Sequence, residues 1–163
     1  DDFEGAKERT ALDTLRLNDT DGGIDRTVQV AQVIPRTASD HVLSLDARMS
    51  TKDDPNAGVI FPLTRGSVQP VDARPFKGVR FDVRGDGAYE LGVNTLSGRW
   101  ASEVQGGAEW RTVEVPFSAL KAAAGWGGAR GPWTGDDLLE VSIDGARPAG
   151  QKLWVEIDNV TFY

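Results

Sequence analysis

The feature that most constrains the fold is a two-residue alternation of apolar and polar side chains in short segments. In 78–84 three apolar side chains alternate with three charged ones, and 43–49, 139–144 and 151–157 repeat this pattern. Successive side chains of a β-strand point to opposite faces, so this period is typical of strands with one buried face. Only 117–124 has helical character, and we expect a turn or two of helix inside a loop. The sequence therefore predicts an all-β protein.

The spacing of these segments narrows the architecture further. About eight or nine strands follow one another with turn residues between them, and no strand–helix–strand alternation interrupts them. Half-buried antiparallel strands on two facing sheets form a β-sandwich, and we expect a jelly roll. A length of 163 residues fits one domain. We therefore treat 1–163 as a single sandwich module.

Two local features refine the expected strands. Residues 85–87 (GDG) have the composition of a tight turn, which predicts a β-hairpin between 78–84 and 89–93. In the last strand the apolar set changes parity across Asp158 and Asn159. A one-residue slip in a strand marks a face change or a β-bulge, and a bulge carrying Asp and Asn would suit a ligand or a metal ion.

Composition excludes several classes of function. The chain has 18 Lys and Arg against 25 Asp and Glu, a net charge of −7, which argues against a nucleic-acid binder. It has no apolar run long enough for a membrane span. With no Cys and only His41, it cannot build a thiolate site or a His-rich metal site.

Tryptophan and carboxylate residues supply the candidate sites. Trp100, Trp126 and Trp133 lie in or near predicted loops, where an indole either stacks on the C–H face of a sugar or packs against the core; both interpretations stay open. The carboxylates of Asp1, Asp2 and Glu4 near the start and of Asp158 near the end could share one calcium ion if the first and last strands are neighbours. Simple surface charge explains these carboxylates equally well.

Four segments carry a resemblance to known proteins: 2–5 (DFEG), 71–87 (VDARPFKGVRFDVRGDG), 110–118 (WRTVEVPFS) and 157–160 (IDNV). The first resembles the start of galactose-binding-like sandwich modules. The others resemble segments of the complex I intermediate-associated protein family and of family 11 carbohydrate-binding modules. The match extends over nearly the whole chain and implies a galactose-binding-like jelly roll without catalytic machinery.

The resemblance also implies site residues. A structural calcium in related modules uses the N-terminal Glu and the C-terminal Asp, which by position are Glu4 and Asp158. Sugar-binding relatives use the outer face of one sheet. The matching outward residues here are Arg80, Asp82, Glu90, Asn94, Glu140 and Ser142. Relatives usually carry several Tyr or Trp on that face, whereas here it is mostly charged.

We therefore expect a non-catalytic carbohydrate-binding or accessory module, monomeric, within a larger exported bacterial protein in the extracellular space or the periplasm. Its partner would be a polysaccharide or oligosaccharide, with calcium as a structural ion. The alternative is a protein-interaction or assembly domain of the complex I intermediate-associated type. A weaker alternative is a glycoside hydrolase with paired carboxylates.

Overall fold

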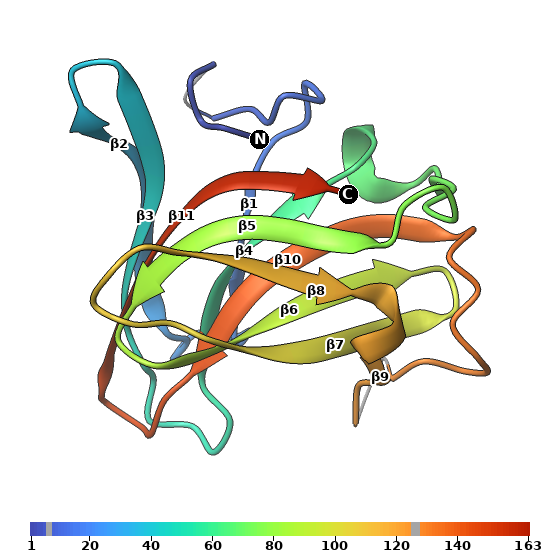
Figure 1. Ribbon diagram of the computed structural model, residues 1–163. Helices are drawn as coiled ribbons and strands as arrows, with labels where there is room; N and C mark the ends of the chain where they lie inside the picture. Colours follow the sequence, from blue (N-terminus) through green and yellow to red (C-terminus); the bar gives the residue numbers. More distant parts are fainter. Residues whose placement is uncertain (6–7, 125–127) are drawn as a thin grey trace.

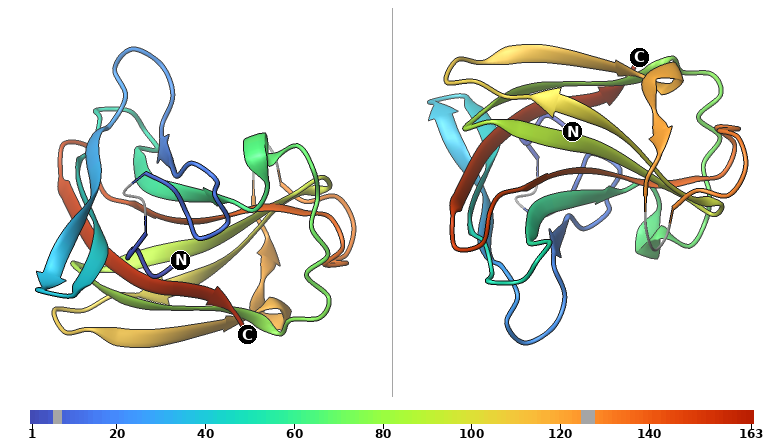
Figure 2. Two further views of the ribbon diagram at one scale, coloured as in Figure 1. Left: turned by 90° about the horizontal axis from the view of Figure 1, so that it is seen from above. Right: turned by 90° about the horizontal axis from the view of Figure 1, so that it is seen from below.

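A computed structural model describes residues 1–5, 8–124 and 128–163 as a sandwich of two antiparallel sheets (Figures 1 and 2). One sheet has six strands in the order β1-β4-β10-β6-β7-β9, and the other has five in the order β2-β3-β11-β5-β8. The strands are β1 (Leu17–Thr20), β2 (Val28–Thr37), β3 (Asp40–Arg48), β4 (Asn56–Pro62), β5 (Gly78–Gly85), β6 (Ala88–Thr95), β7 (Gly98–Gln105), β8 (Arg111–Pro116), β9 (Lys121–Ala122), β10 (Leu138–Ala146) and β11 (Lys152–Phe162).

The core lies between the two sheets and is built from the alternating apolar residues. Leu45, Val83 and Ile157 from the five-stranded sheet meet Leu91 and Ile143 from the six-stranded sheet, and none is more than 1% exposed. Burying such a side chain contributes roughly 1.5–3 kcal/mol. The predicted all-β sandwich is confirmed.

Within 1–5, 8–124 and 128–163, helix is confined to two short 3₁₀ segments, η1 (Arg65–Ser67) and η2 (Phe117–Ala119). The second occupies the stretch expected to form a helical turn, and the two-residue strand β9 follows it. In the described part of the chain, no helix is long and apolar enough to cross a membrane.

The predicted hairpin across 85–87 is wrong. β5 belongs to the five-stranded sheet and β6 to the six-stranded sheet, so the GDG connection carries the chain from one layer to the other (Figure 1). Alternation identifies which side chains of each strand are buried, but it does not identify the neighbouring strand. The inward residues of β5 and β6 face one core from opposite sides, so their outward residues point in opposite directions.

Of the two interpretations of the parity slip near the C-terminus, a face change or a β-bulge, the structure shows the bulge. The β11–β5 register shifts between Asp158 and Thr161, and Asn159 has a φ of 53°. Beyond the bulge, the backbone N–H of Val160 donates to the carbonyl of Asp1 at 2.9 Å. The first residues of the chain therefore lie beside the last strand (Figure 1).

Candidate functional site

A groove with a volume of about 760 Å³ crosses the outer face of the six-stranded sheet. Strands β1, β4, β6, β7 and β10 contribute to it, together with the loops on either side of them. Its lining residues are Asp19, Asp53, Asp54, Pro55, Asn56, Ile60, Asn94, Arg99, Asp144, Ala146, Arg147 and Pro148. We call it the outer groove.

Strand register sets a row of acidic side chains across this face. Asp19 of β1 pairs with Gly58 of β4, which pairs in turn with Asp144 of β10. Asp144 pairs on its other side with Glu90 of β6. Three carboxylates therefore project from one line across four strands, and only Gly58 in that line lacks a side chain.

Two glycines make the arrangement possible. A Cβ on Gly58 would lie 2.3 Å from the Cβ of Asp144, and a Cβ on Gly92 would lie 2.5 Å from an Nη atom of Arg99 and 2.3 Å from the Oγ of Ser142. No side chain fits at either position without displacing these groups. Glycine at position 92 thus leaves room for the Arg99 guanidinium above β6.

Arg99 links the acidic row. Its Nη1 donates to Glu90 Oε1 at 2.6 Å, and its Nη2 donates to Asp144 Oδ2 at 2.9 Å. The hydroxyl of Ser142 donates to the same Asp144 oxygen at 3.0 Å. Charge-assisted bonds of this kind fix side-chain orientation, so the floor of the groove is preorganised.

Burial alters the acidity of this row. Removal from water raises the pKa of Asp144 to about 6, against the opposing attraction of Arg99. Burial also raises the pKa of Asp19. Both carboxyls therefore hold their protons at a higher pH than ordinary aspartates.

The chemistry of the outer groove suits a polyhydroxylated ligand. Its carboxylates accept hydrogen bonds from hydroxyls, while Arg99 and the amides of Asn56 and Asn94 donate to hydroxyl oxygens. None of the described residues that line it is aromatic. Binding here would rest on hydrogen bonds rather than on ring stacking.

Four of the residues expected from the sequence lie on this face: Glu90, Asn94, Glu140 and Ser142. Asn94 lines the groove, and its Nδ2 donates to Glu140 Oε1 at 2.8 Å. The second oxygen of Glu140 accepts from the hydroxyl of Ser67 at 2.8 Å. Of these four residues, only Asn94 lines the outer groove, and a ligand-binding role for the four stays a prediction.

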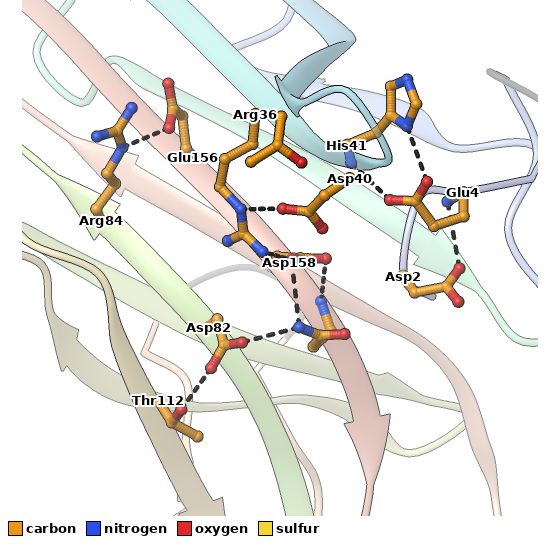
Figure 3. Close-up of polar contacts among 12 residues, drawn as sticks. Asp2, Glu4, Arg36, Asp40, His41, Asp82, Arg84, Thr112, Glu156 and Asp158 are labelled. Atoms are coloured by element: carbon orange, nitrogen blue, oxygen red, sulfur yellow. Dashed lines mark hydrogen bonds and ion pairs between the residues drawn. The ribbon is translucent and has the colours of Figure 1, made fainter.

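The other two outward residues lie on the opposite side of the molecule, which corrects the expected single face. Arg80 and Asp82 are in β5 of the five-stranded sheet, because β5 and β6 do not form a hairpin. Asp82 accepts from Thr112 (Figure 3) and from Asn159. Arg80 is 3.8 Å from Glu114. These side chains do not contribute to the outer groove.

Trp100 and Trp133, two of the tryptophans expected near a ligand, pack against other aromatic rings. Trp100 is only 8% exposed, and its ring meets Trp133 edge to face with centroids 5.9 Å apart. Trp133 also packs on Phe117 with centroids 5.0 Å apart. The packing interpretation therefore holds for both, while Trp126 lies outside the described residues.

Sequence reasoning missed Asp19, Asn56, Arg99 and Asp144. Asp144 was recognisable as an outward residue of its strand, but nothing in the strand pattern set it apart from its neighbours. Asp144 lies in the groove because β4 and β6 flank β10. Gly58 and Gly92, which pair with residues of β10, leave space around it. That register is a property of the assembled sheet.

A smaller cavity of about 190 Å³ opens between the sheets near Leu12, Phe61 and Phe162. Its lining is predominantly aliphatic and aromatic. It lacks the density of donors and acceptors that hydroxyl groups require. We therefore place the candidate site in the outer groove.

Comparison with solved structures finds this fold in carbohydrate-binding modules. The family 11 module from Clostridium thermocellum in complex with a β-1,3-1,4-mixed-linked tetrasaccharide is similar at a TM-score of 0.74 and 14% identity, over 99% of this chain and 92% of that one. The chain has the β-sandwich fold of these modules.

Two further structures extend the comparison. The family 30 module of a cellulosomal cellulase of the same organism gives a TM-score of 0.59 at 12% identity, over 90% of each chain. An exo-β-agarase gives 0.56 at 12% identity, over 90% of this chain but 23% of that one. No protein-family model matches the sequence, and no curated protein matches it. The fold expected from the resemblance is confirmed.

The carboxylates expected to hold calcium are engaged with other groups. Glu4 accepts from the backbone N–H of His41 at 2.5 Å and lies 2.8 Å from His41 Nδ1, whereas Asp158 pairs with Arg36 at 3.0 Å (Figure 3). Among the described residues, no group of three or more acidic or His side chains is arranged to hold a metal ion. This donor set does not fit the six to eight oxygens that calcium takes, and calcium stays a prediction.

Proposed function

We propose that this protein is a non-catalytic carbohydrate-binding module that holds a polysaccharide or oligosaccharide in the outer groove. The observation that carries the proposal is the open polar groove, with its fixed network of Arg99, Asp144 and Glu90. The fold supports the proposal, because the most similar structures described above are carbohydrate-binding modules.

The charges of the groove favour a neutral glycan. Asp19, Asp53, Asp54 and Asp144 outnumber Arg99 and Arg147 in its lining. A uronic-acid polymer would bring further negative charge to this surface, whereas a neutral glucan would not. The family 11 neighbour was solved with a mixed-linked tetrasaccharide, so we take mixed-linked β-1,3-1,4-glucan as the first ligand to test.

We further propose that the module is a monomer within a larger exported bacterial protein, acting in the extracellular space or the periplasm. The agarase comparison supports this setting, because there the similar sandwich is a fraction of a longer enzyme chain. In such a protein the module would keep a catalytic partner close to an insoluble substrate.

Affinity electrophoresis and calorimetry test the proposal with three soluble polymers: mixed-linked glucan, xylan and alginate. We expect retardation and heat with a neutral glucan and none with alginate. A reducing-sugar assay on the same mixtures should find no chain cleavage. If no polysaccharide binds, the carbohydrate proposal fails and the assembly-domain alternative gains support. Release of sugar would instead favour the hydrolase alternative.

A further inference from the structure

A second charged cluster lies on the outer face of the five-stranded sheet, where the chain ends meet (Figure 3). Its centre is Asp158 at the bulge of β11, whose side chain is only 2% exposed. A buried carboxylate needs a compensating cation or a full set of hydrogen-bond donors. The question is therefore which cation neutralises Asp158, beside the point where the two ends of the chain meet.

Arg36 is the cation that reaches this carboxylate in the structure. Its Nη2 is 3.0 Å from Asp158 Oδ2, and its Nε donates to Asp40. The guanidinium carbon also lies over the ring of Trp110, 4.8 Å from the ring centroid. Two carboxylates and an aromatic face therefore fix one planar cation.

The rest of the Asp158 carboxylate is satisfied by its neighbour. Oδ1 accepts from the backbone N–H of Asn159 at 2.7 Å, and Oδ2 is 3.2 Å from the side-chain amide of Asn159. This turn places Asn159 in the left-handed region, with a φ of 53°. The bulge thus aims two donors at Asp158, and Arg36 completes the set.

Glu4 does not complete an oxygen cage around Asp158. Its two oxygens contact the backbone N–H and the ring of His41 at the start of β3 (Figure 3). Both contacts hold Glu4 at β3 rather than at the β11 bulge. Glu4 and Asp158 are therefore held by separate protein contacts, Glu4 at His41 and Asp158 at Arg36 and Asn159.

We propose that Arg36 takes the role expected for a structural calcium ion: its guanidinium supplies the positive charge that holds Asp158 and Asp40 together, and the stability of the fold does not depend on calcium. The inference is independent of sugar binding. It rests on the distances around Asp158 and on the Trp110 ring that fixes the guanidinium.

Thermal unfolding in EGTA and in millimolar CaCl₂ tests this inference with four proteins: the parent, Arg36→Met, Arg48→Met and Arg36→Met with Asp158→Asn. Arg48 is a matched control because it is exposed on neighbouring β3 and pairs with no carboxylate in the described part of the chain. The parent midpoint should be the same in both buffers, within about 1 °C.

Arg36→Met should lower the midpoint by at least about 6 °C, because it leaves a buried charge without its partner. Arg48→Met should change it by no more than about 2 °C. The double variant should recover at least half of the loss, since it removes the unpaired charge as well.

Two results would overturn the inference. One is a parent midpoint several degrees higher in calcium than in EGTA, with that gain lost in the double variant, because calcium would then hold the Asp158 carboxylate. The other is an Arg36→Met variant as stable as Arg48→Met. If Arg36→Met fails to fold, the two-buffer comparison of the parent and the double variant still decides.

Discussion

The outer faces of the two sheets carry similar residues but differ in how those residues are used. On the six-stranded sheet, Gly92 and Gly58 leave room for Arg99 and Asp144 in the lining of an open groove. On the five-stranded sheet, Arg36 and Arg84 lie over Trp110, 4.8 and 5.4 Å from its centroid. The six-stranded face carries the larger groove, of about 760 Å³, whereas the groove beside Arg80 and Asp82 on the five-stranded face has about 520 Å³.

The difference shows that charge alone does not identify a binding face. Arg84 pairs with Glu156 and Arg36 with Asp158, so these side chains satisfy one another and stabilise the sheet. Arg99 also pairs with carboxylates, but it does so at the base of a groove. The candidate site is distinguished by its larger accessible space beside a charged network that is fixed at the floor of the groove.

The largest effect on binding is expected from Gly92→Val. A side chain here would occupy the position of the Arg99 guanidinium and would also protrude into the site. We expect the affinity for a binding glucan to fall more than about 100-fold, because both the hydrogen bonds and the shape of the surface are lost.

Gly107→Val is the matched control, since a Cβ at Gly107 would meet nothing within 4 Å. Calorimetry gives both affinities, and circular dichroism verifies that both variants are folded. Equal affinities would contradict the assigned groove.

A smaller effect on binding is expected from Arg99→Met. It removes the charged donor at the centre of the groove, which should weaken binding about 10–100-fold. Arg80→Met makes the same chemical change on the opposite face and should leave affinity unchanged within about twofold. A larger loss of affinity in Arg80→Met than in Arg99→Met would mean that the glucan binds to the five-stranded sheet.

The smallest effect concerns pH. Because burial raises the pKa of Asp144 to about 6, the native state keeps this proton between pH 4 and 6 while the unfolded chain has released it. The free energy of unfolding should therefore fall as pH rises, by about 1.5 kcal/mol from this group between pH 4.5 and 6.

Denaturant titrations at several pH values measure this slope. Asp144→Asn should flatten it, whereas Asp46→Asn, a change in β3 of the other sheet, should not. An unchanged slope in Asp144→Asn would show that Asp144 is not buried as described.

The features that were predicted from the sequence are those that a few consecutive residues determine. Alternation identified the inward side chains of β5, β6, β10 and β11, and the parity slip identified the bulge at Asp158. These features depend on the period of a strand and on burial, which a few consecutive residues express.

Long-range pairing explains what was not predicted. The turn at 85–87 crosses between the sheets, and this separates Arg80 and Asp82 from Glu90 and Asn94. Arg99 and Asp144 come together only because β7, β6 and β10 are neighbours and Gly92 lies between them. No pattern within a few consecutive residues shows that these three strands are neighbours.

The most direct test of the central claim is an amide chemical-shift titration of the ¹⁵N-labelled protein with a mixed-linked glucan oligosaccharide. We predict that the largest shifts occur around Gly58, Gly92 and Ser142 of the six-stranded sheet, while Asp82 and Arg84 of the five-stranded sheet do not move. Shifts confined to β5, β8 and β11, or no shifts with any neutral glycan, would contradict a carbohydrate site in the outer groove.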